Sequence, residues 1–224
     1  MCILVVLCTE MREEAMGARK KEALERFNRD NILTAAKELF ELNGIEHTTM
    51  DDIARQADYS KSTIYVYFKS KEDIYNSIVS DYMSLLTQDI ELSLASQQDF
   101  KKSYLAMCNC LADFHSRYPK YYASLLGEEK TTNAKKGTGQ KADLVLDHSL
   151  EALIDALLEK GVKQKKIPPN RKNRQTIIYL WSGVSGIIRV ADKRREGLEK
   201  YCGLSREKYL SYAFELFYQS LIGG

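Results

Sequence analysis

The chain has 224 residues, of which 44% are hydrophobic and 29% charged, and its formal net charge is +2. This length allows one large or two small domains with a proper core, and 3 Pro and 12 Gly suit an almost wholly helical protein. Because acidic and basic residues nearly balance, the net charge alone gives no evidence for nucleic-acid binding. Five Cys without framework spacing predict free thiols in a reducing, cytoplasmic setting.

Residues 1–18 form an N-terminal extension that we expect to be disordered. Its apolar run, CILVVLC, is short for the core of a secretion signal, and no Lys or Arg precedes it. Met11 and Met16 offer later starts. No other segment is long enough to span a bilayer, so we expect no membrane association.

A first helix is predicted from about Arg26 to Asn43, because its apolar stripe recurs at helical spacing and Gly44 is typical of a helix end. The stripe consists of Ile32, Ala35, Ala36, Leu39 and Phe40. Residues 17–75 hold slightly more acids than bases, but bases gather at the start of this helix. They are Arg19, Lys20, Lys21, Arg26 and Arg29. Local placement matters more than the sum, so a nucleic-acid role stays open.

Residues 48–73 predict two short helices separated by a tight turn. Thr49 is a suitable N-cap for the first helix, since Asp52 three residues on completes a capping box. Asp58 follows the end of that helix, and Asp tolerates the left-handed backbone conformation that such a turn demands. This pattern is typical of a helix-turn-helix.

The second short helix is predicted to contact DNA. Ser60 caps it, Ile64 and Phe68 share its inward face, and Ser70 caps the next helix beside Lys71. Two exposed tyrosines on so short a helix favour DNA contact over core packing alone. The candidate DNA-binding residues are Thr49, Ser60, Lys61, Ser62, Thr63, Tyr65, Tyr67 and Lys71. We expect Lys61, Ser62 and Tyr65 to reach base edges, and Thr49, Thr63, Tyr67 and Lys71 to contact phosphates.

Residues 26–75 resemble the DNA-binding domain of the TetR family of bacterial transcriptional regulators. The resemblance is carried, in register, by DNILTAAKELFELNGIEHTTM, DDIARQA, SKSTIYVYF and KSKEDI. The main departure is Asp58, where the family usually has Gly. The resemblance implies an all-α chain in which residues 19–70 form a three-helix DNA-binding domain. Residues 71–224 would form a larger helical domain for effector binding and dimerisation.

Further helices are predicted along the second domain. One begins at Lys71 and continues to about Ala95, and another follows a cap at Asp99 and breaks at Pro119. Residues 131–141 have the composition of a loop, and a helix follows from about Ala142 to Lys160. The basic run KGVKQKKIPPNRKNR is interpreted as a solvated connection rather than a second nucleic-acid site.

An effector pocket is predicted from the apolar stripe of the helix after Asp99. At helical spacing such residues are more often core than pocket, so both interpretations stay open. Cys108 and Cys110 with His115 do not form a metal site, because residues two apart on a helix project in different directions. The effector candidates are Tyr104, Met107, Cys108, Leu111, His115 and Trp181.

The last two predicted helices, residues 174–193 and 206–222, favour a dimer interface. The first carries small residues that allow close helix approach, and the second is apolar nearly all round. Burial of either helix in its own core is the alternative. The interface candidates are Trp181, Gly183, Gly186, Ala213 and Phe217.

The sequence therefore predicts a homodimeric regulator that represses transcription from a palindromic double-stranded DNA operator and is released by a small-molecule effector. Two alternatives share the scaffold: an activator, and an effector-independent nucleoid-associated or architectural DNA-binding protein. An enzyme is not supported, since His47, His115 and His148 lie in separate segments and no phosphate-cradling Gly loop occurs. We expect no catalytic residue, metal or cofactor.

Overall fold

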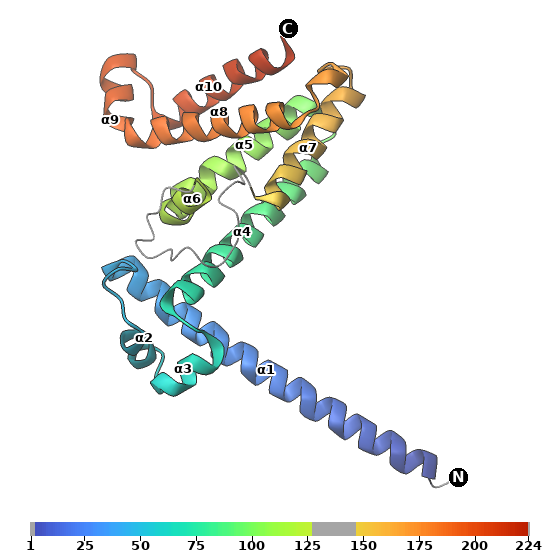
Figure 1. Ribbon diagram of the computed structural model, residues 1–224. Coiled ribbons are helices and arrows are strands. Elements are labelled where there is room, and N and C mark those ends of the chain that lie inside the picture. The colour runs from blue at the N-terminus through green and yellow to red at the C-terminus, as the bar shows by residue number, and fades with distance from the viewer. Residues whose placement is uncertain (1–2, 127–146, 224) are drawn as a thin grey trace. The chain divides into compact units, whose positions relative to one another are not determined.

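A computed structural model describes residues 3–126 and 147–223, with side chains from Met16 onwards except Ala18. Every regular element in these ranges is a helix (Figure 1), which confirms the all-α prediction. None of the described helices combines the length and apolarity needed to cross a bilayer. The loop expected at residues 131–141 and the helix start expected at Ala142 lie outside the described residues.

The chain divides into two compact units, Met1–Asp81 and Tyr82–Gly224. Helix α4, Lys71–Ser96, runs through the boundary. The sequence places the domain boundary at residues 70 and 71, where α4 begins. Its predicted end near Ala95 agrees closely with the observed end.

In the first unit, helix α1 spans Ile3–Asn43 and is followed by Gly44, whose φ of 78° is left-handed. The end agrees with the prediction, but the helix begins at Ile3 rather than near Arg26, through a segment expected to be disordered. The side chains at residues 19–27 are all exposed. Residues 9–25 are mostly Ala, Glu, Lys, Arg and Met, so helix propensity rather than packing supports this part of α1.

Helices α2, Met50–Gln56, and α3, Lys61–Tyr67, pack beside the C-terminal half of α1 (Figure 1). The core of this unit is apolar, and α4 contributes to it through its first two turns. Its buried side chains include Ile32, Ala36, Phe40, Ile53, Ala54, Ile64, Phe68, Ile74 and Ile78. These residues hold α3 with one face inward and the opposite face free.

The second unit contains the rest of α4 and the longer helices α5, Phe100–Arg117, α6, Pro119–Leu125, α7, His148–Lys163, α8, Arg174–Lys193, and α10, Arg206–Ile222. Shorter elements are η1, Pro169–Arg171, α9, Arg195–Gly197, and η2, Leu198–Cys202. Helices α8 and α10 lie side by side (Figure 1) and begin and end where the sequence predicts. Pro119 is the first residue of α6, as expected of a break between helices.

Helix α7 is tied to the turn between α4 and α5 by Lys160. Its ammonium donates hydrogen bonds to the carbonyl oxygens of Leu94 and Gln97, at 2.9 and 2.7 Å, and to the Ser103 hydroxyl at 2.9 Å. All three N–H donors are therefore used inside the protein, and they satisfy carbonyls that the end of α4 leaves free.

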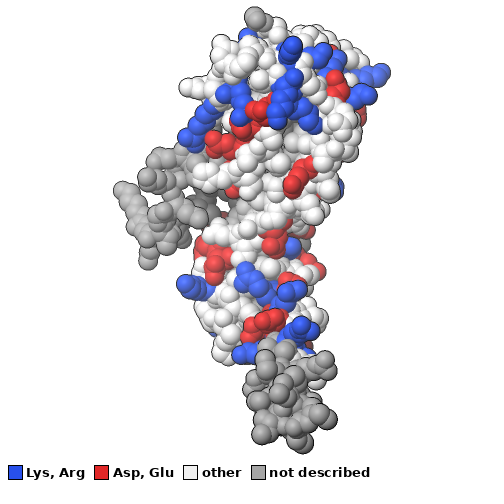
Figure 2. Space-filling view, turned by 90° about the vertical axis from the view of Figure 1, so that its right-hand side faces the viewer, with Lys and Arg blue, Asp and Glu red and all other residues white. Residues whose placement is uncertain are grey.

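The basic connection between α7 and α8 is also tied to its own unit. Lys172 pairs with Asp155 and Glu159, each at 3.2 Å, and Arg171 donates to the carbonyl oxygen of Leu221 at 2.6 Å. On the face shown in Figure 2, neither sign of charge covers the surface by itself. These contacts agree with a connecting segment.

Candidate nucleic-acid interface

The start of α2 is fixed by a capping box. The Thr49 hydroxyl accepts a hydrogen bond from the Asp52 amide at 3.2 Å, and the Asp52 carboxylate accepts from the Thr49 amide at 3.0 Å. Hydrogen bonds from Thr49, aided by nearby Arg55, hold the pKa of Asp52 below its usual range. The predicted cap is confirmed, and it places Thr49 at an exposed helix start.

The turn between α2 and α3 depends on a left-handed residue. Asp58 has φ of 57°, as the sequence predicts, and the Tyr59 amide donates to the Ala54 carbonyl at 2.9 Å. This geometry reverses the chain within a few residues. It brings α3 against α2 and directs the outer face of α3 to solvent.

Ser60 caps α3, as predicted. Its hydroxyl accepts from the Thr63 amide at 3.1 Å and lies 2.8 Å from the hydroxyls of both Ser62 and Thr63. Ile64 and Phe68 are buried, which confirms the inward face. The N-terminus of α3 thus presents several hydroxyl groups at the surface.

The outward face of α3 carries Lys61, Ser62, Tyr65 and Val66. Tyr65 is 50% exposed and Val66 79% exposed. The sequence predicts base contacts for the first three, whereas Val66 is not among the sequence-based candidates. Its position beside Tyr65 was the available signal.

Lys61 is paired with an acid on α2. Its ammonium lies 2.9 Å from the Asp51 carboxylate, and both side chains are more than half exposed. The hydrogen bond to Asp51, together with its charge, raises the pKa of Lys61 above its usual range. Lys61 stays charged, and a small motion can bring it to another acceptor.

Tyr67 and Thr63 are half-buried at the edge of this face. The Tyr67 hydroxyl accepts a hydrogen bond from the Asn28 amide of α1 at 3.0 Å. Arg29, the next residue of α1, lies with its guanidinium 4.4 Å from the centre of the Phe68 ring and donates to Ser77 at 3.0 Å. The sequence did not reveal these α1 contacts, because nothing local relates residues 28 and 29 to α3.

Lys71, a predicted phosphate contact, has partners within the protein. Its ammonium donates to the carbonyl oxygens of Ile45, Glu46 and Thr48, at 2.7, 3.1 and 3.0 Å. An ammonium has three N–H donors, and all are used here. The structure thus gives Lys71 a structural role, which is to hold the turn between α1 and α2.

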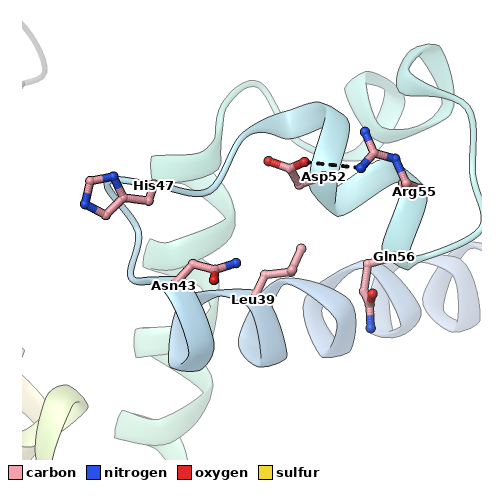
Figure 3. Close-up of a pocket in the computed structure, with 6 residues that line it drawn as sticks. All are labelled: Leu39, Asn43, His47, Asp52, Arg55 and Gln56. Atoms are coloured by element: carbon pink, nitrogen blue, oxygen red, sulfur yellow. Dashed lines mark ion pairs between the residues drawn. The ribbon is translucent and has the colours of Figure 1, made fainter.

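A separate groove lies between the end of α1 and α2 (Figure 3). Asp52 pairs with Arg55 across 3.7 Å, and Gln56 donates to Glu38 at 2.8 Å. None of the candidate DNA-binding residues lines this groove, whose lining is Leu39, Asn43, His47, Asp52, Arg55 and Gln56. It is therefore distinct from the outward face of α3.

The effector candidates of the second unit, His115 apart, lie in its buried core. Tyr104, Met107, Cys108, Leu111 and Trp181 are all buried, and the Tyr104 hydroxyl donates to the Phe214 carbonyl at 3.1 Å. Burial raises the pKa of the Cys108 thiol to about 12. The predicted buried thiol is confirmed at Cys108, whereas Cys110 is half-buried and lies 3.2 Å from Ser93. Effector binding by this cluster stays a prediction.

His115 joins a charged cluster. Its Nδ1 lies 2.8 Å from the Asp192 carboxylate, which also accepts from Arg206 at 2.6 Å. Burial lowers the pKa of His115 below its usual value, although Asp192 opposes this. Burial alone would raise the pKa of Asp192, but the hydrogen bond and charge of Arg206, with His115 and Arg195, hold it below its usual range. The cluster ties α5, α8 and α10 together.

The interface candidates divide into two groups. Trp181 is only 3% exposed and lies in the chain's own core, and a Cβ added at Gly183 would overlap the Phe217 ring. Those three residues therefore contribute to packing within the chain, and their part in a dimer interface stays a prediction. Gly186 faces open space, and Ala213 is partly exposed. The exposed apolar side chains on this pair of helices are Tyr179, Val190, Tyr212 and Leu216.

Comparison with known proteins shows that this chain is similar to bacterial transcriptional regulators. Residues 32–78 match the family model described as bacterial regulatory proteins, tetR family. The chain is 25% identical to the HTH-type transcriptional regulator SrpR of Pseudomonas putida, covering 76% of this chain and 78% of SrpR. It is 28% identical to IcaR of Staphylococcus aureus, the negative transcriptional regulator of the icaADBC biofilm operon, covering 68% and 79%.

Solved structures agree in fold. A TetR/AcrR-family regulator from Thermobifida fusca has a TM-score of 0.64 and 19% identity, covering 85% of this chain and 96% of that one. FadR from Bacillus subtilis, solved with stearoyl-CoA, has a TM-score of 0.62 and 18% identity, covering 87% and 97%. The capped α2, the turn and α3 form a helix-turn-helix, and the relatives named above are transcriptional regulators. Residues 32–78 belong to the TetR family of bacterial regulatory proteins, and the rest of the chain has the fold of solved TetR-family regulators.

Proposed function

We propose that the protein is a homodimeric transcriptional repressor that binds a palindromic DNA operator and is released by a small-molecule effector. The observation that carries the proposal is the outward face of α3, which presents a lysine, a serine, a tyrosine and a valine to solvent on a helix fixed by caps at Thr49 and Ser60. Repression is favoured because the relative IcaR is a negative regulator.

The direct contacts with DNA follow from side-chain chemistry. Lys61 and Ser62 supply donors for base edges in the major groove, and Tyr65 and Val66 supply apolar contact, for which a thymine methyl is suitable. Ser60 and Thr63, with Thr49 at the start of α2, supply hydroxyl donors for phosphates. Phosphate contacts fix the position of α3, and base contacts select the sequence.

Dimerisation is proposed through α8 and α10 of two copies. Tyr179 is 48%, Tyr212 63% and Leu216 57% exposed, which is unusual for large apolar side chains in one region. Gly186 leaves open space on α8, so another helix can approach its backbone there. A two-fold contact between such helix pairs forms a four-helix interface and sets the separation of the two α3 helices.

Effector release is proposed to act through the second unit, where the aromatic residues gather. The Tyr122 ring lies 6.1 Å from that of Trp181 and 4.7 Å from that of His115. An apolar ligand that separates such side chains can shift the protein only if it prefers one conformation. A hundredfold loss of operator affinity needs about 2.7 kcal/mol of coupling, and operator DNA must weaken ligand binding by the same factor.

The test of DNA binding is selection from a random pool of duplexes, with the bound fragments sequenced. We expect a palindromic motif whose half-sites lie about one helical turn, roughly 34 Å, or slightly more apart. A Lys61→Ala, Tyr65→Ala double variant serves as control and should lose the motif. If no sequence is enriched, or if the double variant selects the same motif, the proposal is wrong.

The test of release is a panel of apolar and aromatic compounds, first screened for a rise in melting temperature and then added to the operator complex. A compound that stabilises the free protein and lowers operator affinity supports the proposal. Stabilising compounds that leave operator affinity unchanged, or the failure of every compound to bind, would favour the architectural alternative.

A further inference from the structure

The side chain of Asn28 on α1 joins two tyrosines of the helix-turn-helix. Its Nδ2 donates to the Tyr67 hydroxyl oxygen at 3.0 Å, and its Oδ1 accepts from the Tyr59 hydroxyl at 2.8 Å. The amide of Asn31 donates in turn to the Tyr59 oxygen at 3.4 Å. All four side chains are half-buried, which limits competition from water.

The direction of donation along this chain of hydrogen bonds is set at Tyr59. Its oxygen receives a hydrogen bond from Asn31, so its single proton is directed at Oδ1 of Asn28. A carboxamide has one oxygen and one nitrogen, so the nitrogen of Asn28 faces Tyr67. Tyr67 is therefore an acceptor towards the protein, and its own proton remains available for an acceptor outside.

That remaining proton decides what the Tyr67 hydroxyl can bind. Tyr67 is the last residue of α3, next to the exposed Val66. A phosphate oxygen accepts hydrogen bonds but donates none. A hydroxyl whose proton points outward binds it, whereas a hydroxyl that donates inward presents lone pairs to it.

We propose that Asn28 is a positioning residue for DNA binding, which orients the Tyr67 hydroxyl so that it donates to a backbone phosphate. The inference rests on the proposed function, since it requires DNA at the outward face of α3. Asn28 itself needs no contact with DNA.

The main test is Asn28→Asp, which keeps the shape of the side chain but replaces the donor facing Tyr67 by an acceptor. Tyr67 must then donate inward. We expect operator affinity to fall about tenfold for each half-site and about a hundredfold for the dimer, as for loss of a hydrogen bond to a charged group. Affinities are measured by fluorescence anisotropy on the selected operator.

The matched control is Thr34→Asp, which adds the same charge further along α1 at an exposed residue whose hydroxyl donates to the Asp30 carbonyl, outside this chain of hydrogen bonds. Asn28→Asp should therefore cost more affinity than Thr34→Asp. In a Tyr67→Phe background this excess should vanish, because the hydroxyl through which Asn28 acts is gone. Circular dichroism melting establishes that each variant is folded.

A second variant covers the case in which Asn28→Asp does not fold. Tyr59→Phe removes the proton that holds Oδ1, so the carboxamide of Asn28 can rotate and present its oxygen to Tyr67. Operator affinity should fall severalfold, and again the loss should be absent in the Tyr67→Phe background. A loss that persists in that background would assign Asn28 and Tyr59 to general stability.

The outcomes distinguish a failure of the proposed function from a failure of the role of Asn28. If the unmutated protein selects no DNA, the proposed function fails, and this proposal with it. If the protein binds its operator but Asn28→Asp loses no more affinity than Thr34→Asp, or the excess loss survives in Tyr67→Phe, only the role of Asn28 is overturned.

Discussion

The ammonium of Lys71 lies 3.0 Å from the carbonyl oxygen of Thr48, so the first residue of α4 holds the turn that leads into α2. The Thr48 hydroxyl donates to the Gly44 carbonyl at 2.8 Å within the same turn. These bonds bring three segments of the first unit together. They give Lys71 a part in the stability of this turn, and we propose that it makes no phosphate contact.

Lys71→Met, which keeps most of the apolar stem, should lower the free energy of unfolding by about 1–3 kcal/mol, because three carbonyl oxygens lose a charged donor. The salt dependence of operator binding should be unchanged, whereas a phosphate contact would flatten its slope by about one unit. Thermal melting and a salt titration of operator affinity measure the two effects. A flatter slope with unchanged stability would restore the phosphate contact.

Asp58→Gly should be neutral or stabilising, by up to about 1 kcal/mol, because φ of 57° is less costly for Gly than for Asp. Asp58→Ala is the matched comparison, since Ala has neither the freedom of Gly nor a polar side chain, and it should destabilise. Melting temperatures in one buffer decide the order. If Asp58→Gly melts clearly below the unmutated protein, the carboxylate contributes more than the backbone strain costs.

Asp51→Asn should raise operator affinity severalfold, because it releases Lys61 from its 2.9 Å ion pair and removes a negative charge near the DNA. Lys61→Ala should weaken binding and change the preferred base at one position of each half-site. Selection from the random pool, repeated with each variant, measures both. Equal sequence preference in Lys61→Ala would limit Lys61 to phosphate contact.

Gly186→Trp and Leu216→Glu should each yield monomers that remain folded, because Gly186 faces open space within the chain and Leu216 is 57% exposed. Leu92→Glu, at an exposed leucine of α4, is the control and should remain dimeric. Light scattering at micromolar concentration gives the masses. A monomeric unmutated protein would contradict the interface on α8 and α10.

Protein stability should depend on pH through His115. Burial gives it a lower pKa in the folded protein than its usual value near 6.5, so the unfolded chain binds the proton more readily. The stabilisation from neutral His115 is present above about pH 6.5 and declines as the pH falls below it. Between pH 7.5 and 5.5, the melting temperature of His115→Gln should therefore fall by less than that of the unmutated protein. Parallel curves would mean that the Asp192 charge compensates fully.

Local signals made much of the first unit predictable. The caps at Thr49 and Ser60 and the left-handed Asp58 depend on residues within a few positions of one another, so the sequence alone reveals them. The apolar stripe predicts a start of α1 near Arg26, but the helix begins at Ile3, and the composition of residues 9–25 favours a helix without such a stripe.

Side-chain partners distant in sequence were not predictable in the same way. Lys71 is a basic residue at a helix start, which favours a phosphate contact. Only the folded chain shows that carbonyl oxygens of the α1–α2 turn surround its ammonium. Trp181 and Gly183 lie on a helix whose two faces are both rich in apolar or small residues. Periodicity identified that helix correctly but did not reveal which face packs against α10.

Lys71 and Lys160, whose ammonium groups donate three hydrogen bonds each within the protein, should also differ from exposed lysines in chemical reactivity. Lys71 and Lys160 each have three hydrogen bonds to break before the nitrogen can attack an acylating reagent, whereas Lys69 and Lys102 are exposed to solvent. Brief acetylation followed by mass spectrometry should therefore label the exposed pair first. The acetylation rate of Lys71 would report on opening of the first unit, and the acetylation rate of Lys160 on opening of the second. Local opening of each unit can therefore be measured separately.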